Sequence, residues 1–430
     1  MPEVCKDCNE EYNEYWCRPC NSTRFVNDFD KWTSENEIID KFIQEAQRNA
    51  DYYKLIEWMP YNKFESIKLM AKGGYGTIYY AIWVDGYIDD WDIENQQWER
   101  YGPFEVVLKK FDGIIDINEE FLNELAVHLR ANSNSIASTT LFGLTKDPVT
   151  QEYMMVLQYY KGGSLRNYLN NNFNIIDWDV KLSYLSKLAN ELSEIHALNI
   201  VHRDFHPGNI LKHSSNSNSI CISDFGLSKL ITENIKNSKM NTISGVLPYI
   251  APEVLGGGEY TKAADVYSFA FVAYEMITGL PPYHDVSHDK ELAFNICNGF
   301  RPKIPFHTPK LITQIIMRCW DARTTHRPTF QELKKELDKY YAEYDKYRNN
   351  NTEITIQINK AKEFSKNPTT TIIPMNYKTH PQAFYTSRLL NFSNLPKPKN
   401  DVNFEKELEE LSESFYQINI DDDDDDLFNL

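Results

Sequence analysis

The stretch HRDFHPGNIL, residues 202–211, decides how the rest of the chain is interpreted. It sets a carboxylate, Asp204, five residues before an amide, Asn209, and an acidic turn, Asp224-Phe225-Gly226, follows twenty residues after Asp204. A long predicted helix precedes the stretch, with Asp177 as a candidate N-cap. Its inward face carries Leu182, Leu185, Leu188, Leu192 and Ile195. We therefore expect a buried helix to position a short polar loop.

A glycine cluster lies further upstream, in KLMAKGGYGTIYYAIW, residues 68–83. Gly73, Gly74 and Gly76 separate two β-rich runs, and a glycine turn there would bring backbone N–H groups close to phosphate oxygens. The cluster is weak evidence by itself, because hairpin turns also use glycine.

A lysine and a glutamate follow at a spacing that suits an ion pair. Lys109 ends the apolar run FEVVLKKF, and Glu124 lies in the helical stretch EEFLNELAVHLRA. A glutamate on that helix would hold the lysine ammonium toward phosphate oxygens. Taken alone, two unrelated surface charges would be the simpler interpretation. The next stretch, MMVLQYYKGGSLRNYL, predicts a buried strand that reaches Leu157, then a hinge and a new helix.

Further motifs follow in order: Ala251-Pro252-Glu253, Asp265 in ADVYSFAF, Cys319-Trp320 and Arg327-Pro328. With the features above they make at least seven motifs at workable spacing, so residues from about 64 to 340 resemble the eukaryotic protein kinase domain. The Cys-Trp and Arg-Pro ending resembles the tyrosine-kinase-like group. The whole layout is similar to a lineage-expanded family of kinases of mycorrhizal-type fungi. The resemblance implies an α+β, bilobal fold, with a small β-rich N-lobe containing helix C and a large, mainly helical C-lobe.

The resemblance also implies roles in moving the γ-phosphate of ATP to a protein hydroxyl. Asp204 would orient the acceptor hydroxyl and take its proton, and Asn209 and Asp224 would hold Mg²⁺. Lys109, held by Glu124, would bind the α- and β-phosphates. The residues expected to contact the nucleotide are Gly73, Gly74, Gly76, Ile78, Val107, Lys109, Leu157, Gln158 and Tyr160.

Other residues of the resemblance have structural or regulatory roles. Arg327 is expected to pair with Glu253, and Asp265 to brace the catalytic loop. Arg203 is a candidate cation for a phosphorylated activation loop, with a local backbone contact as the alternative. The candidate acceptors in that loop are Thr232, Ser238, Thr242 and Ser244.

Position 206 departs from the usual pattern, in which Ser/Thr kinases carry a lysine two residues after the base. His206 is shorter and could either keep a proton beside Asp204 or donate one hydrogen bond while neutral. Val246 replaces a threonine that bonds the base and that lysine, so one small network is lost as a whole. Gly208 stands where tyrosine kinases place an arginine, and Tyr249 fits the Ser/Thr pattern. These residues favour Ser/Thr specificity and leave tyrosine or dual specificity open.

A pseudokinase, a nucleotide-binding or scaffolding module without phosphotransfer, is the alternative function. The departures that support it are Ala71, Val107, His206, Val246 and Ala270. The intact positions that favour an active enzyme are Lys109, Glu124, Asp204, Asn209 and Asp224. Drift without selection for chemistry would be expected to change some of these five, so we expect an enzyme.

Four cysteines form the pattern C-x2-C-x8-C-x2-C near the N-terminus: Cys5, Cys8, Cys17 and Cys20. Each pair can hold one edge of a tetrahedral zinc site; isolated thiols or a redox pair are the alternative. Four thiolates leave no open position, so the zinc would be structural. It would dock the following helix on the small lobe or recruit a protein partner. The remaining cysteines, Cys221, Cys297 and Cys319, are scattered, and an odd total argues against a disulfide framework.

Composition narrows the partners and the compartment. The hydrophobic content of 42% and charged content of 25% are ordinary for a globular protein. Of the net charge of −17, −11 falls in the last thirty residues, and no concentrated basic face indicates nucleic acid or an anionic membrane as a partner. No secretory signal, myristoylation glycine or membrane-spanning run is visible. We expect a soluble, cytoplasmic protein that binds protein substrates.

The expected organisation is a paired-cysteine element over 1–24, a helical linker over 25–60, a kinase domain over 61–342 with lobes 61–157 and 161–342, and a mostly disordered acidic tail over 343–430. Ser34 is a candidate N-cap for a linker helix whose apolar face is Ile38, Ile39, Phe42, Ile43 and Ala46. In the tail, Phe404, Leu408, Leu411 and Phe415 have helical spacing, which predicts either docking on a partner or on the domain, or a transient helix. Asp421–Asp426 is expected to be extended.

Overall fold

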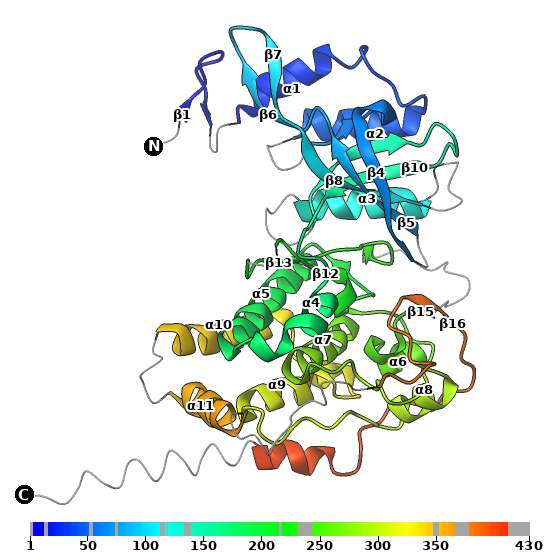
Figure 1. Cartoon of the computed structure of the whole chain (residues 1–430), viewed down its shortest axis with the longest axis vertical. Helices are drawn as coiled ribbons and strands as arrows, with labels where there is room; N and C mark the ends of the chain where they lie inside the picture. Colours follow the sequence, from blue (N-terminus) through cyan, green and yellow to red (C-terminus); the bar gives the residue numbers. More distant parts are fainter. Residues whose placement is uncertain are drawn as a thin grey trace, which may run out of the picture. The chain divides into compact units, whose positions relative to one another are not determined.

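The chain forms two compact units, Met1–Lys161 and Gly162–Leu430, in this computed structural model (Figure 1). The structure describes residues 3–12, 16–50, 55–73, 76–111, 117, 119–132, 139–214, 217–230, 243–346, 352–365 and 378–411. The predictions for Gly74, Thr232, Ser238, Thr242, Phe415 and Asp421–Asp426 lie outside these residues. Among the described helices, none is both long enough and apolar enough to cross a membrane.

The first unit is built on a six-stranded sheet in the order β3–β9–β10–β8–β5–β4. Its strands are β3 (Glu57–Trp58), β4 (Phe64–Gly73), β5 (Gly76–Trp83), β8 (Phe104–Lys110), β9 (Leu141–Lys146) and β10 (Tyr153–Gln158). β3 is parallel to β9, and the other pairs are antiparallel. Side chains alternate between the faces of the sheet, so Met155 and Leu157 of β10 enter one core while Met154 and Val156 enter the other.

Two helices contribute side chains to one of these cores: α2 (Glu37–Arg48) and α3 (Glu119–Asn132). Ile39 and Ile43 of α2 are fully buried there with Phe121 and Leu125 of α3. The predicted linker helix therefore belongs to the core of the first unit, and Phe42 and Ala46 pack against it. One predicted member of its apolar face is wrong, because Ile38 is 52% exposed.

The predicted N-cap of α2 is also wrong. Asn36 caps the helix, and its side-chain oxygen accepts hydrogen bonds from the backbone N–H groups of Ile38 and Ile39. The Ser34 hydroxyl instead donates to the carboxylate of Asp40. Either side chain suits an N-cap, but the helix begins at Glu37, which places Asn36 at the cap position.

The N-terminal element packs on a hairpin inserted into the sheet. Its elements are β1 (Glu3–Val4), β2 (Glu11–Tyr12) and α1 (Arg18–Asn27), and the hairpin is β6 (Tyr87–Asp92) and β7 (Gln97–Tyr101). Trp98 of β7 stacks on Phe25 of α1, with ring centroids 4.5 Å apart, and on Trp16, at 6.0 Å. The Arg24 guanidinium lies 4.5 Å from the ring centroid of Trp91. The insertion thus forms the surface that receives the first helix.

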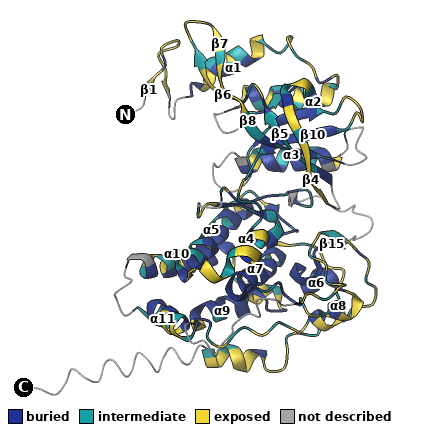
Figure 2. Cartoon of the chain, in the orientation of Figure 1, coloured by how far each residue is buried: buried dark blue, intermediate teal, exposed yellow. Residues whose placement is uncertain are grey.

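The second unit is mainly helical. Its helices are α4 (Leu165–Asn172), α5 (Trp178–Ala197), α6 (Pro252–Leu255), α7 (Lys262–Thr278), α8 (Lys290–Cys297), α9 (Lys310–Cys319), α10 (Phe330–Lys346) and α11 (Glu353–Ser365). Asp177 caps α5, as predicted, and the five aliphatic residues predicted to face inward on α5 are all buried. Figure 2 shows α5 and α7 as largely buried helices of this unit.

Three short antiparallel strand pairs complete the second unit: β11 (Ile200–Val201) with β14 (Lys229–Leu230), β12 (Ile210–Lys212) with β13 (Ile220–Ile222), and β15 (Ile243–Gly245) with β16 (Arg388–Leu390). Among the described residues, the short 3₁₀ helices are 61–63, 173–175, 207–209, 247–249 and 324–326. The third strand pair joins the middle of the chain to its C-terminal part (Figure 1).

Two parts of the predicted disordered tail are ordered. α11 buries Ile354, Ile358 and Ala361. Residues 378–411 run along the second unit, and the helix over 404–411 buries Phe404. Near its start, the Asn400 side chain accepts from the Ala322 N–H and donates to Asp321. Of the alternatives for the tail helix, these contacts favour docking on the domain.

A buried ion pair fastens α6 to the segment before α10. Arg327 and Glu253 make two hydrogen bonds of 2.7 Å, and the Arg327 guanidinium also donates to two backbone carbonyls. The Arg327 side chain is fully buried. The predicted pairing is confirmed.

We expect Arg327→Ala to destabilise the second unit by about 3–5 kcal/mol, because it leaves the Glu253 carboxylate without its buried partner. The control is Lys406→Ala, in the helix over 404–411, whose ion pair with Glu410 is exposed on both sides and whose loss should cost about 1 kcal/mol or less. Urea unfolding of both variants measures the difference. Equal losses would contradict this account.

Candidate active site

The carboxylate of Asp265 holds the catalytic loop from within α7. Its two oxygens accept the backbone N–H groups of His202, at 2.8 Å, and Arg203, at 2.9 Å. His196 of α5 lies 2.9 Å from the same carboxylate. Burial by itself would raise the pKa of Asp265, but the hydrogen bond and charge of His196 and the backbone donors hold that pKa below its usual value. The predicted brace is confirmed.

The loop turns sharply at Arg203, whose φ of 69° lies in the left-handed region. The next residue, Asp204, is then fixed by Asn209, whose amide nitrogen donates to the Asp204 backbone oxygen at 3.0 Å and to its carboxylate at 3.2 Å. The Arg203 guanidinium lies 4.5 Å from the ring centroid of Tyr260. Asp204 and Asn209, which are five positions apart in the sequence, are therefore joined by hydrogen bonds.

His202 supports the loop in a single tautomer. Its Nδ1 accepts from the Asp204 N–H at 3.3 Å, so Nε2 carries the proton that it donates to the Ser223 carbonyl at 3.2 Å. Burial lowers the pKa of His202, although three nearby carboxylates, those of Asp265, Asp204 and Asp224, act to raise it. The imidazole is therefore neutral at pH 7.

The strand pair β12–β13 brings the candidate metal ligands together. Asn209 precedes β12 and Asp224 follows β13, and the Ser223 N–H donates to the Asn209 carbonyl at 2.8 Å. Asp224 has a φ of 62°, and one of its carboxylate oxygens accepts the Gly226 N–H at 3.2 Å. Because the Asn209 nitrogen donates to Asp204, the amide oxygen is the atom of this side chain that a cation could use. Oxygens of this kind fit Mg²⁺.

In the first unit, the predicted Lys109–Glu124 ion pair is formed and buried. The Lys109 ammonium lies 2.5 Å from a Glu124 carboxylate oxygen, between β8 and α3. Lys109 stands opposite Ile78 of β5 and Met155 of β10 in the sheet register. The ammonium is therefore held on a rigid strand.

The other predicted nucleotide contacts surround Lys109 in this sheet. Gly73 pairs with Gly76 at the β4–β5 turn, and Val107 stands opposite Leu157. Gly76 has a φ of 145°, and a Cβ there would lie 2.3 Å from the Lys110 carbonyl oxygen, so only glycine fits. Gln158 ends β10, and the Tyr160 hydroxyl donates to its side chain at 3.4 Å.

The largest departure from the usual kinase pattern, His206, has a defined role in the loop. Its Nδ1 accepts the Gly208 N–H at 3.0 Å, which leaves Nε2 as the protonated nitrogen of a neutral imidazole. Nε2 lies 3.3 Å from the hydroxyl oxygen of Ser387 and 3.6 Å from Asp204. Of the two alternatives for His206, this geometry favours donating one hydrogen bond while neutral.

Sequence reasoning did not find Ser387 as a residue of this site. Its hydroxyl donates to the Asp204 carboxylate at 2.5 Å. It comes from the tail, on the segment 378–390 that ends in β16, and only a hydroxyl-rich run, Tyr385-Thr386-Ser387, marks it in the sequence. The predicted activation-loop acceptor Ser244 lies on the partner strand β15, where its hydroxyl donates to the Arg388 carbonyl at 3.4 Å.

The four N-terminal cysteines converge. Their sulfur atoms all lie within 4.8 Å of one another, with Cys5 and Cys20 at 3.8 Å and Cys8 and Cys17 at 3.5 Å. These distances are too long for disulfides. A tetrahedral zinc site with metal–sulfur bonds of about 2.3 Å has sulfur–sulfur edges of about 3.8 Å. The donor set therefore fits zinc.

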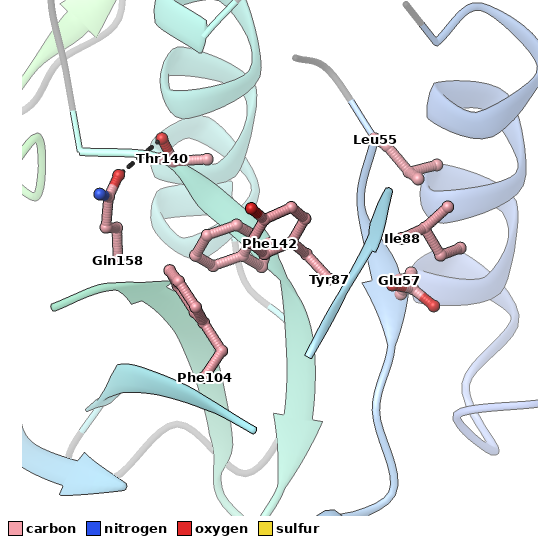
Figure 3. A pocket seen from close by; sticks show the side chains of 8 residues that line it. All are labelled: Leu55, Glu57, Tyr87, Ile88, Phe104, Thr140, Phe142 and Gln158. Atoms are coloured by element: carbon pink, nitrogen blue, oxygen red, sulfur yellow. Dashed lines mark hydrogen bonds between the residues drawn. The ribbon is translucent and has the colours of Figure 1, made fainter. Parts of the chain in front are cut away.

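A pocket of about 210 Å³ opens elsewhere on the first unit (Figure 3). Its lining residues are Leu55, Glu57, Tyr87, Ile88, Phe104, Thr140, Phe142 and Gln158. Phe104 and Lys109 are five positions apart on β8. Because successive side chains on a strand alternate between its faces, these two lie on opposite faces. Of the predicted nucleotide contacts, only Gln158 lines this pocket, so we do not assign the pocket to the nucleotide.

Comparison with known proteins agrees with this geometry. Residues 64–337 match the family model described as protein tyrosine and serine/threonine kinase. The chain belongs to this protein kinase family. The match spans residues of both units. It does not decide whether the acceptor residue is serine or threonine, or tyrosine.

Several curated relatives are similar to this kinase. It is 29% identical over 287 residues to the serine/threonine-protein kinase VIK of Arabidopsis thaliana, covering 64% of this chain and 60% of that protein. It is 30% identical to the probable serine/threonine-protein kinase roco5 of Dictyostelium discoideum, covering 65% of this chain and 10% of that protein. The dual specificity protein kinase splA of the same organism is 33% identical over 42% of this chain and 8% of its own length.

We expect His202 to remain the neutral, Nε2-protonated tautomer at pH 6.5, where half of unperturbed imidazoles carry a second proton. Because burial lowers its folded-state pKa, the contribution of His202 to stability is present above pH 6.5 and is lost as the pH falls below that value. Imidazole ¹⁵N NMR of the whole chain measures the tautomer. A doubly protonated His202 at pH 6.5 would contradict the assignment.

Proposed function

We propose that this kinase transfers the γ-phosphate of ATP to serine or threonine hydroxyl groups of proteins. The observation that carries the proposal is the Ser387 hydroxyl, hydrogen-bonded to the carboxylate of Asp204. A candidate base that already holds an alcohol proton donor has the geometry of general-base catalysis. The formed Lys109–Glu124 pair supports an enzyme over a pseudokinase.

Lys109 would neutralise the α- and β-phosphates, since Glu124 keeps its ammonium fixed without removing its charge. The proposed nucleotide contacts remain Gly73, Gly74, Gly76, Ile78, Val107, Lys109, Leu157, Gln158 and Tyr160. Asn209 and Asp224 would hold Mg²⁺, which supplies charge neutralisation of the phosphate oxygens when it is bound. Each of these contributions is positioning or electrostatic, as phosphoryl transfer requires.

Asp204 would accept the proton of the attacking hydroxyl. Its second carboxylate oxygen is buried and accepts no hydrogen bond from the described residues, so it can receive that proton. His206 would donate from Nε2 to the acceptor oxygen or to a phosphate oxygen. It would thereby supply one hydrogen bond where related enzymes use a lysine charge.

Serine and threonine are favoured over tyrosine because of reach. At Ser387, the residue directly before β16, a hydroxyl only one bond beyond Cβ reaches Asp204. A tyrosine at position 387 would place its hydroxyl well past the carboxylate. The Arabidopsis and roco5 relatives are named as a serine/threonine-protein kinase and a probable one, in agreement with this specificity.

We further propose that the kinase acts in the cytoplasm in signalling and falls in the tyrosine-kinase-like group, near the expanded fungal family. The supporting features are the Cys-Trp and Arg-Pro ending and the paired cysteines ahead of the domain. Reduced thiols and ATP both fit an intracellular compartment.

Zinc is proposed as a structural cofactor of Cys5, Cys8, Cys17 and Cys20. The second cysteine pair begins α1, so the metal would fix the helix that stacks Phe25 on Trp98. This supports docking of the helix on the first unit as the role of the element.

Asp204→Asn should lower phosphate transfer from labelled ATP by about 10²–10⁴-fold, because the base is lost while the shape is kept. The measured quantity is the total labelled phosphate incorporated into an added generic protein and into the kinase itself. Glu409→Gln, at an exposed carboxyl of the helix over 404–411, is the matched control and should retain wild-type transfer. Equal signal from the wild type and Asp204→Asn would end the enzyme interpretation.

Elemental analysis of reduced protein should find one zinc ion per chain. Cys8→Ser should lose the zinc and lower the thermal stability of the first unit, since structural zinc contributes directly to folding. Cys221→Ala, at a buried cysteine of β13, should keep the zinc. Folded wild-type protein without zinc would contradict the proposal.

A further inference from the structure

The segment 378–390 binds to the second unit beside Asp204, turning at residues 381–382 and ending in the strand β16. β16 pairs antiparallel with β15, so that Leu390, Leu389 and Arg388 stand opposite Ile243, Ser244 and Gly245. β15 and β16 form a two-stranded sheet of their own, so backbone hydrogen bonds to β15 fix the register of this part of the segment. Leu390 is 6% exposed, whereas the neighbouring Leu389 is 66% exposed. The strand is therefore anchored by one buried side chain in a defined register.

The loop 282–288 holds the same segment further upstream. The His288 N–H donates to the Gln382 carbonyl at 3.0 Å, and the Phe384 N–H donates to His288 Nδ1 at 3.1 Å. The Tyr385 hydroxyl donates to the Pro282 carbonyl at 2.9 Å. These bonds hold the segment before residue 386, and the pairing of β16 with β15 holds it after that residue.

A buried arginine joins the segment to the helical core. Arg166 of α4 forms an ion pair with Glu275 of α7 at 3.0 Å and donates to the Tyr385 carbonyl at 3.0 Å. Its guanidinium also lies 5.0 Å from the Tyr385 ring centroid. The segment therefore contacts an arginine that Glu275 of α7 already holds in place. The contact is at Tyr385, two residues before Ser387.

Ser387 is the residue that this arrangement delivers to the chemistry. Its hydroxyl donates to one Asp204 oxygen at 2.5 Å, and its oxygen lies 3.3 Å from the protonated Nε2 of His206. With one lone pair accepting from His206, the second lone pair remains to attack. Gly245 makes room for this approach, because a Cβ there would lie 3.3 Å from the other Asp204 oxygen.

We propose that Ser387 is the acceptor of an intramolecular phosphoryl transfer, and that residues 378–390 occupy the site of protein substrates until the transfer occurs. The inference rests on the proposed kinase function and names its first substrate. Ser387 Oγ forms a bond to the γ-phosphorus of ATP, and the bond from that phosphorus to the β,γ-bridging oxygen breaks. The hydroxyl proton passes to the Asp204 carboxylate, and ADP leaves with the electron pair of the broken bond.

The product has a clear consequence for the segment. A phosphoserine carries close to two negative charges and would lie beside the Asp204 carboxylate, so like-charge repulsion would release the strand. The occupied site would then open to other proteins. The neighbouring hydroxyl, Thr386, is exposed and makes no contact with Asp204 in the described residues, so the transfer is specific for position 387.

The test is phosphosite mass spectrometry of the full chain after incubation with Mg·ATP at several dilutions. Ser387 phosphate should form with one first-order rate constant, within about twofold across dilutions, because an intramolecular step does not depend on concentration. A tagged Asp204→Asn chain mixed with the wild type should stay unmodified at Ser387. Rapid labelling of that tagged chain, or phosphate at Thr386 but not at Ser387, would overturn the proposal.

A pair of variants separates this proposal from the kinase function itself. Leu390→Asp removes the buried anchor and should slow Ser387 phosphorylation by at least about tenfold while speeding the labelling of an added protein, since effective concentration is lost. Leu389→Asp makes the same change at the exposed neighbour and should behave as wild type. If Leu390→Asp labels added protein but wild-type Ser387 is never modified, the kinase function stands and this proposal fails. If neither protein transfers phosphate, both fail.

Discussion

The carboxylate of Asp265 is the fixed point on which the candidate active site depends. It accepts two consecutive backbone N–H groups of the catalytic loop, and His196 holds it from α5. A loop with a residue in the left-handed region would otherwise have several conformations of similar energy. Two charge-assisted hydrogen bonds in a buried site select one of these conformations. That conformation of the loop places Asp204 and Asn209 within hydrogen-bonding distance of one another. The chemistry proposed above is therefore prepared by a residue that touches no substrate.

Much of this arrangement could be predicted from sequence because motif spacing encodes it. The pairs Lys109–Glu124 and Arg327–Glu253 join groups whose roles are linked by charge, and both pairs form as expected. Local competition was harder to foresee. Ser34 and Asn36 are both good N-caps, and the sequence does not show that the helix begins at Glu37, directly after Asn36.

The C-terminal part of the chain marks the limit of sequence reasoning. A polar, asparagine-rich segment predicts disorder, since it buries little apolar surface of its own. Residues 378–411 are instead ordered by surfaces made elsewhere in the chain: the strand 243–245, the loop 282–288 and the buried Arg166. None of these partners is visible in the composition of the tail. The contacts of Ser387 depend on the pairing of β16 with the distant strand β15, which places Ser387 beside Asp204.

One structure determination tests the central claim most directly. A crystal structure of the full chain with Mn²⁺ and a non-hydrolysable ATP analogue would locate the metal by anomalous scattering. Our account predicts metal ligated by the Asn209 amide oxygen and the Asp224 carboxylate, with the Ser387 hydroxyl still on Asp204 and facing the γ-phosphate. A nucleotide that binds without metal at these two side chains, or a metal held by other residues, would contradict it.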